Sequence, residues 1–139
     1  MAQKKHVTRK RTETKAKSSG KARGRNRFLI VIPTYNEKGN IRQLIPAILE
    51  KDKRIDILFI DDNSPDGTGK IIQQELRKNK RLHLIKRESK SGLGTAYVRG
   101  FQYALEEKYK YIFEMDADFS HDPAYLPDLI KTLDKGADV

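Results

Sequence analysis

Two carboxylates one residue apart, Asp116 and Asp118, follow an apolar run in the stretch from Tyr111 to Pro123. The run is typical of a buried strand, and Pro123 predicts the start of a helix with Asp122 as its N-cap. The two carboxylates therefore fall at the carboxyl end of a strand, where open α/β sheets bind ligands. Because neighbouring carboxylates repel, a cation that prefers oxygen ligands, Mg²⁺ or Mn²⁺, would suit them. Ordinary turn formation and helix capping is the alternative interpretation.

Four strand-sized apolar segments alternate with four helical patterns along the rest of the chain. The strands are expected at 28–32, 55–60, 82–85 and 111–115, and the helices around 41–49, 68–78, 94–108 and 123–135. In the third helix the expected buried stripe consists of Ala96, Gly100, Phe101, Ala104 and Leu105. The βαβαβαβα order predicts an α/β fold, a Rossmann-like and mostly parallel sheet with helices on both faces. Residues 137–139 resemble the approach to a further strand, so we expect an incomplete domain.

Composition limits the function classes. The chain has 139 residues and no cysteine, so it has room for one domain and no thiol nucleophile, disulfide or cysteine zinc site. No apolar stretch approaches the roughly 20 residues of a transmembrane helix. The net charge of +10 lies entirely in residues 1–27, which hold eleven Lys or Arg and one acid, whereas residues 28–139 are neutral.

The basic segment 1–27 lacks apolar periodicity, so we expect a disordered tail rather than part of the fold. It has no apolar core of a secretory signal. Three roles stay open: a solvated extension, attachment to an anionic membrane surface, and a nucleic-acid-binding arm. The tail has no aromatic residue to stack on bases, which makes nucleic acid the least favoured partner.

Other polar clusters follow the predicted strands. The sequence Pro-Thr-Tyr-Asn-Glu at 33–37 follows the first strand, and Asp-Asp-Asn-Ser-Pro-Asp-Gly-Thr at 61–68 follows the second. Dinucleotide-binding, Walker and nucleophile-elbow motifs are all missing from these positions. Acids at a common sheet edge, with a divalent cation, suit a ligand that brings its own negative charge, such as a nucleoside diphosphate.

Four segments in order resemble the motifs of polyprenyl-phosphate (dolichol-phosphate) mannosyltransferases, which are inverting family 2 glycosyltransferases of GT-A fold. They are Ile-Pro-Thr-Tyr-Asn-Glu at 32–37, the acidic run at 61–68, Gly-Leu-Gly-Thr-Ala-Tyr at 92–97, and Met-Asp-Ala-Asp at 115–118 with Ser120 and His121. The resemblance covers residues 28–139 and not the tail. It implies a donor-binding part of a family 2 domain that is incomplete at its C-terminus.

The resemblance also implies roles for individual residues. Asp116 and Asp118 would bind Mg²⁺ or Mn²⁺ and act in catalysis through it. The residues that would bind the nucleotide sugar are Pro33, Tyr35, Glu37, Asp61, Asp62, Asp66 and Lys90. Ser120 stands where some relatives carry a glutamine ligand, so a third protein ligand is in question. His121 is expected beside the site rather than as a base, and Arg99 is either a surface charge or an acceptor contact.

The implied reaction passes mannose from GDP-mannose to a polyprenyl phosphate with inversion. A phosphate nucleophile is ionised near neutral pH, so no strong general base is needed. The expected location is the cytoplasmic face of a membrane, with peripheral attachment. Two alternatives stay open: a UDP-sugar as the donor, and a fragment that binds a nucleotide sugar without turnover.

Overall fold

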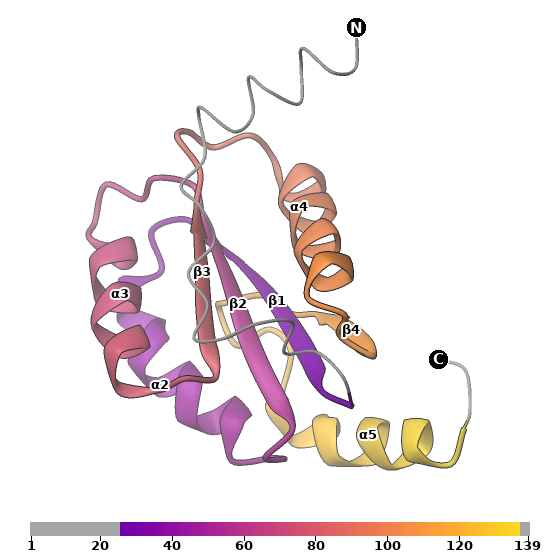
Figure 1. Cartoon of the computed structure of the whole chain (residues 1–139). Helices are drawn as coiled ribbons and strands as arrows, with labels where there is room; N and C mark the ends of the chain where they lie inside the picture. Colours follow the sequence, from indigo (N-terminus) through magenta and orange to yellow (C-terminus); the bar gives the residue numbers. More distant parts are fainter. Residues whose placement is uncertain (1–25, 137–139) are drawn as a thin grey trace, which may run out of the picture.

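The computed structural model describes residues 26–136, which form one parallel sheet with helices on both faces (Figure 1). The strands are β1 (Phe28–Thr34), β2 (Ile55–Asp61), β3 (Leu82–Lys86) and β4 (Tyr111–Glu114), in the order β3-β2-β1-β4. All three pairings are parallel, and Thr34, Asp61 and Lys86 are aligned at the carboxyl ends of β1, β2 and β3. The predicted α/β sheet and its alternation of elements are confirmed.

Alternate side chains of the central strands pack in two separate hydrophobic cores, one on each face of the sheet. Phe28, Ile30 and Ile32 of β1 pack in the larger core, which is covered by α2 (Lys38–Leu49), α3 (Thr68–Lys78) and α5 (Leu126–Asp134). Leu29 and Val31 point to the opposite face, where α4 (Leu93–Glu106) supplies the cover. Nearly every β1 and β2 residue is buried, as expected of central parallel strands with helices on both sides.

Helix α4 lies very close to β1, and a glycine permits it. A Cβ built on Gly100 would come within 2.5 Å of Val31 Cγ1, which is closer than real side chains approach. Gly100 therefore sets the distance between α4 and the sheet. The strand-to-helix segment before α4 includes the turn at Gly92, whose φ of +98° suits glycine.

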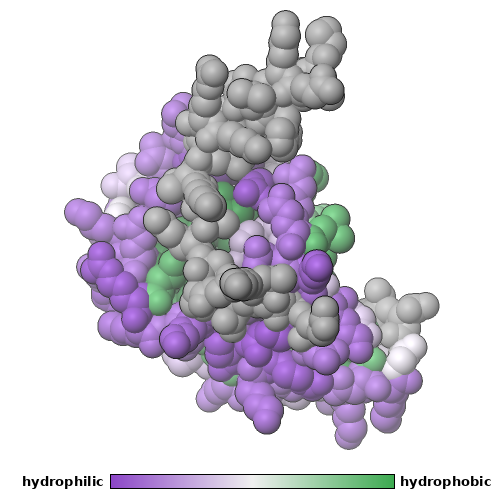
Figure 2. Space-filling model, in the orientation of Figure 1, coloured by the Kyte–Doolittle hydropathy of each residue, from purple (hydrophilic) through white to green (hydrophobic). Residues whose placement is uncertain are grey.

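The predicted buried face of α4 is partly wrong. Ala96, Gly100 and Ala104 are buried as expected, but Phe101 is 37% exposed and Leu105 is 74% exposed. Tyr103 takes the inward position instead, with its ring 5.9 Å from that of His83. Figure 2 shows apolar surface at the side where Figure 1 places α4. The helix carries two apolar stripes, and periodicity alone does not tell which one faces the sheet.

Strand β4 is less buried than its apolar sequence predicts. Tyr111, Ile112 and Phe113 are half-buried and Glu114 is exposed, whereas Met115 just beyond the strand is fully buried. Within the described residues β4 pairs with β1 alone, so it forms an edge of the sheet. After it, Asp122 caps the short 3₁₀ helix η1 (Pro123–Tyr125) by accepting a hydrogen bond from the Ala124 N–H, as predicted.

The expectation of disorder for the basic tail concerns residues that lie, apart from Asn26 and Arg27, outside the described part of the chain. Arg27 itself belongs to the fold, because its guanidinium pairs with the buried Asp56 at 2.5 Å. The expected approach to a fifth strand at 137–139 is also outside the described residues. No helix between residues 26 and 136 has the length and apolar character needed to cross a membrane.

Candidate donor-binding and metal site

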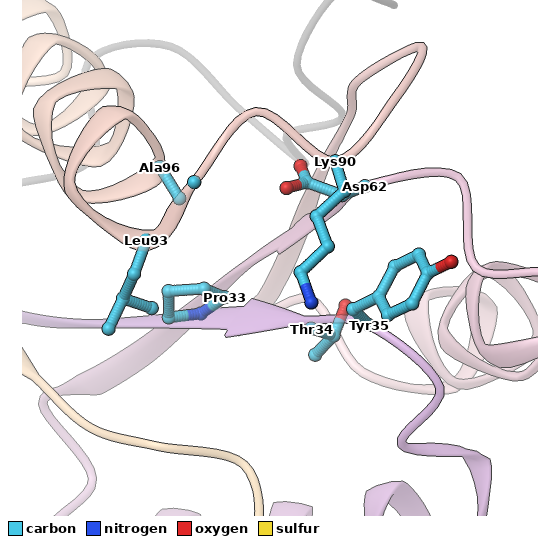
Figure 3. Close-up of a pocket in the computed structure, with 8 residues that line it drawn as sticks. Pro33, Thr34, Tyr35, Asp62, Lys90, Leu93 and Ala96 are labelled. Atoms are coloured by element: carbon cyan, nitrogen blue, oxygen red, sulfur yellow. The ribbon is translucent and has the colours of Figure 1, made fainter.

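A pocket opens at the carboxyl ends of β1 and β2 and is closed on one side by the start of α4 (Figure 3). Its lining consists of Pro33, Thr34, Tyr35, Asp62, Lys90, Gly92, Leu93 and Ala96. Four of the predicted nucleotide-sugar residues, Pro33, Tyr35, Asp62 and Lys90, are therefore brought together. Apolar surface with a few charged groups is the usual make-up of a small-molecule pocket.

Two side chains from different loops meet across this pocket. The Lys90 ammonium lies 4.7 Å from the centroid of the Tyr35 ring, which is within the range of a cation–π interaction. Tyr35 is 39% exposed, so the ring face is accessible from the pocket. An aromatic face and an exposed cation are suited to a nucleotide, since the ring can stack on a base and the ammonium can approach a phosphate.

Asp62 is held by an arginine that sequence reasoning did not single out. Arg87 donates from Nε to Asp62 Oδ1 at 2.6 Å and from Nη2 to Asp62 Oδ2 at 2.8 Å. Both side chains are at most 9% exposed. The guanidinium also donates to Thr95 Oγ1 at 2.9 Å and to the Gly92 carbonyl at 3.3 Å. Arg87 thus fixes the Asp62 carboxylate against the start of α4.

Asp61 and Asp66 have their oxygens directed into the loops rather than into the pocket. Asp61 accepts hydrogen bonds from Thr34 Oγ1 at 2.7 Å, from Ser64 Oγ at 2.6 Å and from the Ser64 N–H at 3.1 Å. Asp66 accepts from the Lys38 N–H and from the backbone and hydroxyl of Thr68. These contacts tie the loops after β1 and β2 together, and nucleotide binding by either residue stays a prediction.

Glu37 is not among the residues that line the pocket, and it lies near the acids of the neighbouring loops. Burial raises the pKa of Glu37, and the negative charges of Asp118, Asp66 and Asp116 raise it further against an opposing hydrogen bond with Asn40. Its Oε2 is buried, with no hydrogen-bond partner among the described residues. Glu37 is thereby placed close to the Asp116–Asp118 pair, and its predicted contact with the nucleotide remains a prediction.

The loop after β4 holds Asp116 and Asp118 around Ser120. The Ser120 hydroxyl donates to Asp116 Oδ2 at 3.2 Å, and the Ser120 N–H donates to Asp118 Oδ1 at 2.9 Å. Hydrogen bonds from the Ser120 side chain and backbone lower the pKa of Asp118, so this carboxylate is ionised at neutral pH. His121 Nδ1 accepts a hydrogen bond from the Asp116 N–H at 3.2 Å, so it lies beside the pair as expected.

Asp116 has a second donor on helix α4. The Tyr97 hydroxyl lies 3.3 Å from Asp116 Oδ1 and donates to it. Burial raises the pKa of Tyr97, and the adjacent Asp116 carboxylate raises it further, so the hydroxyl keeps its proton. Sequence periodicity could not reveal this contact, because it joins two residues from separate elements.

The two carboxylates are chemically suited to a hard divalent cation. Asp118 is exposed and Asp116 is partly exposed, so lone pairs on both remain accessible. No group of three or more His, Cys, Asp or Glu side chains within residues 26–136 is arranged to hold a metal ion. Two carboxylates completed by substrate phosphates and water are nevertheless a common Mg²⁺ arrangement. The residues present therefore fit a cation that binds together with a diphosphate.

The comparison with known families decides the classification of this fold and site. The family model described as glycosyl transferase family 2 matches residues 29–139. The chain belongs to glycosyl transferase family 2. The sequence-based resemblance is confirmed at this level, and the match covers all four strands except Phe28, together with the acids at 61–68 and 116–118.

Two similar relatives of this family 2 chain are named as mannosyl-transferring or mannose-lipid-forming proteins. It is 42% identical over 114 residues to polyprenol monophosphomannose synthase of Mycolicibacterium smegmatis, covering 81% of the chain and 43% of that protein. It is 39% identical over 107 residues to undecaprenyl-phosphate mannosyltransferase of Micrococcus luteus, covering 77% and 44%. The family 2 chain therefore spans less than half the length of either relative.

Solved structures share the fold of this family 2 chain. S. aureus TarS, residues 1–349, matches with a TM-score of 0.66 at 22% identity, covering 78% of the chain and 32% of TarS. The mannosyltransferase PcManGT of Pyrobaculum calidifontis, in complex with GDP-Man and Mn²⁺, matches with a TM-score of 0.53 at 22% identity, covering 66% and 28%. The predicted GT-A architecture is confirmed.

Proposed function

We propose that the chain is the donor-binding part of an enzyme that transfers mannose from GDP-mannose to a polyprenyl phosphate with inversion. The observation that carries this proposal is the arrangement at the carboxyl edge of the sheet. There the pocket lined by Tyr35, Asp62 and Lys90 lies at the end of β1, and the loop that holds Asp116 and Asp118 follows β4, the strand paired with β1. The names of the two relatives support a mannosyl donor and a polyprenyl phosphate acceptor.

In this proposal the nucleoside occupies the pocket, with its base against Tyr35 and near Asp62. The base displaces the Lys90 ammonium from the Tyr35 ring, and Lys90 moves toward the donor phosphates. Arg87 keeps the Asp62 carboxylate in a fixed orientation through its two hydrogen bonds. A preoriented carboxylate gains more from a hydrogen bond with the base than a freely rotating one, because less conformational entropy is lost.

Asp116 and Asp118 would hold Mg²⁺ or Mn²⁺, which supplies Lewis-acid neutralisation of the charge on the departing diphosphate. The complex of PcManGT with GDP-Man and Mn²⁺ supports a divalent cation in this fold. The acceptor phosphate oxygen forms a bond with the sugar C1 while the bond from C1 to the GDP oxygen breaks, which inverts the anomeric centre. Because the acceptor phosphate is already ionised, no protein residue needs to remove a proton.

We further propose that the protein works at the cytoplasmic face of a membrane as a peripheral protein, because the acceptor is a lipid and the donor is water-soluble. The basic segment 1–27 is one candidate for the attachment to anionic lipid. Removing that segment is expected to weaken binding to anionic vesicles and to leave binding to neutral vesicles unchanged. Equal binding of both forms would contradict a role for the segment.

The test is a transfer assay with the full chain, Mn²⁺, undecaprenyl phosphate in detergent and either GDP-mannose or UDP-glucose. We expect lipid-extractable sugar from GDP-mannose only, and none from the Asp118→Asn variant. A preference for UDP-glucose would reject the mannosyl donor. Binding of GDP-mannose without any transfer would reject catalysis by this chain and favour a nucleotide-sugar-binding fragment.

A further inference from the structure

Three consecutive residues in the first turn of α4 each contact a different part of the site. Successive helical residues point about 100° apart, so neighbours on one turn face different surroundings. Thr95 Oγ1 accepts from Arg87, the partner of Asp62, at 2.9 Å. Ala96 is buried and lines the pocket. Tyr97 donates to Asp116 at 3.3 Å. This part of α4 therefore contacts Asp116 directly and Asp62 through Arg87.

Tyr97 is placed to determine how Asp116 is oriented. Its ring is partly buried and packs against the core cluster under α4, which limits the directions that its hydroxyl can take. That hydroxyl meets Asp116 Oδ1, while the Ser120 hydroxyl meets Oδ2, so each carboxylate oxygen has one donor. A carboxylate that accepts a hydrogen bond at each oxygen cannot rotate freely. Each oxygen still keeps a lone pair for a further ligand.

We propose that Tyr97 is a positioning residue that orients the Asp116 carboxylate for a divalent cation, and that Thr95 on the same helix supports the nucleotide pocket through a separate contact with Arg87. The inference rests on the proposed function, because it assigns Tyr97 a task at the same cation site. Hydrogen bonds from outer residues to ligating carboxylates commonly change metal affinity by tenfold or more. Tyr97 supplies such a bond from a helix rather than from the acidic loop itself.

The chain offers a matched control in Tyr125. This residue is close enough to Asp116 for the carboxylate to contribute to the raised pKa of its phenol, after the larger effect of burial. No hydrogen bond joins Tyr125 to Asp116 among the described contacts. Tyr125→Phe therefore removes a hydroxyl from the same neighbourhood without removing a donor to Asp116.

The first measurement is Mn²⁺ binding to the full chain by electron paramagnetic resonance, without nucleotide. We expect Tyr97→Phe to weaken Mn²⁺ affinity about tenfold and Tyr125→Phe to leave it unchanged. Equal Mn²⁺ affinity of wild type and Tyr97→Phe would overturn the inference.

A second measurement separates the two ends of the helical turn. GDP binding in EDTA reports on the pocket without the cation, and we expect Tyr97→Phe to preserve it. Thr95→Val should weaken this GDP binding several-fold and leave Mn²⁺ affinity unchanged, because it removes the hydroxyl that supports Arg87. If each variant loses both GDP binding and Mn²⁺ binding, the two contacts do not act separately. Such a result would indicate general damage to α4 and contradict the inference.

These outcomes distinguish the inference from the function on which it rests. If wild type binds neither Mn²⁺ nor GDP, the proposed donor site fails and the role of Tyr97 fails with it. If wild type binds both and Tyr97→Phe binds Mn²⁺ equally well, the proposed function stands and only the inference fails. Tyr97→Phe and Tyr125→Phe keep the aromatic ring, and Thr95→Val keeps the branched shape of the side chain. Thermal unfolding of each variant checks that the fold is intact.

Discussion

Asp56 and Asp118 are both acids of the same α/β sheet, but their surroundings are opposite. Asp56 lies in β2 near its amino end and is fully buried. Its Oδ1 pairs with Arg27 at 2.5 Å, and its Oδ2 accepts from Tyr109 at 2.6 Å and lies 3.2 Å from His83 Nε2. Asp118 lies beyond the carboxyl end of β4, is exposed, and accepts hydrogen bonds from Ser120.

The difference shows how a structural acid can be told from one that is available to a ligand. Burying a carboxylate costs several kcal/mol unless partners satisfy it, and Asp56 has three such partners from three parts of the chain. An exposed carboxylate with few partners contributes little to stability but keeps lone pairs for a cation. Asp61 and Asp66, with their loop hydrogen bonds, resemble Asp56 more closely than Asp118 in this respect.

The largest effect on stability is expected from Asp56→Ala. Removing one member of a buried ion pair leaves the others uncompensated, so the free energy of unfolding should fall by about 3–5 kcal/mol in urea denaturation. The matched control is Asp134→Ala, which removes an exposed partner of Arg54 at 3.0 Å and should leave unfolding nearly unchanged. Equal effects of the two substitutions would contradict the assignment of Asp56 as a structural acid.

Asp62 stands between the two extremes, since it is buried and also lines the pocket. Arg87→Met should lower the free energy of unfolding by about 3 kcal/mol, because the Asp62 carboxylate loses its ion-pair partner. Adding Asp62→Asn should recover part of that loss, since the buried charge is then gone. If the double variant is as unstable as the sum of the single variants, the two side chains do not interact as described.

Glu37 provides a pH-dependent test of the acidic neighbourhood. Burial, followed by the charges of Asp118, Asp66 and Asp116, raises its pKa in the folded state, so ionisation of Glu37 lowers stability as pH rises through that value. Glu37→Gln should therefore raise the melting temperature slightly at pH 7 and lose this advantage below about pH 4, where the wild-type group is protonated in both states. An unchanged Glu37→Gln advantage across this pH range would contradict the electrostatic explanation.

The smallest effect on stability is expected from Asp118→Asn. The side chain is exposed and its amide oxygen can still accept the hydrogen bond from the Ser120 N–H, so thermal unfolding should be indistinguishable from that of wild type. Mn²⁺ binding should nevertheless be lost, because a ligand charge is removed. A clear drop in melting temperature would mean that Asp118 is a structural acid like Asp56.

The sequence predicts the framework of this protein well because the signals are local. The helix expected at 68–78 coincides with α3 (Thr68–Lys78), and the four strands lie where apolar runs end in polar clusters. The Asp122 cap is likewise confirmed, since it depends on residues two apart. The arrangement of strand ends along one edge follows from the parallel order, so the gathering of Tyr35, Asp62 and Lys90 could be predicted.

Features that depend on distant partners could not be predicted in this way. The half-buried state of β4 follows from its position at the edge of the sheet that residues 26–136 form, and the buried face of α4 follows from the close approach of Gly100 to Val31. Arg87 has an ordinary sequence context. Only the fold shows that it forms an ion pair with Asp62, which lies 25 residues earlier in the chain. The buried contact between Asp56 and His83 is missed for the same reason.

The most direct test of a metal-assisted donor site is a calorimetric titration of the full chain with GDP-mannose, with and without Mn²⁺, for wild type and Asp118→Asn. We expect wild type to bind more tightly with Mn²⁺ than without it, and Asp118→Asn to bind with the same low affinity in both conditions. Binding by folded Asp118→Asn that is enhanced by Mn²⁺ as in wild type, or no binding by folded wild type in either condition, would contradict a metal-assisted donor site at this edge of the sheet.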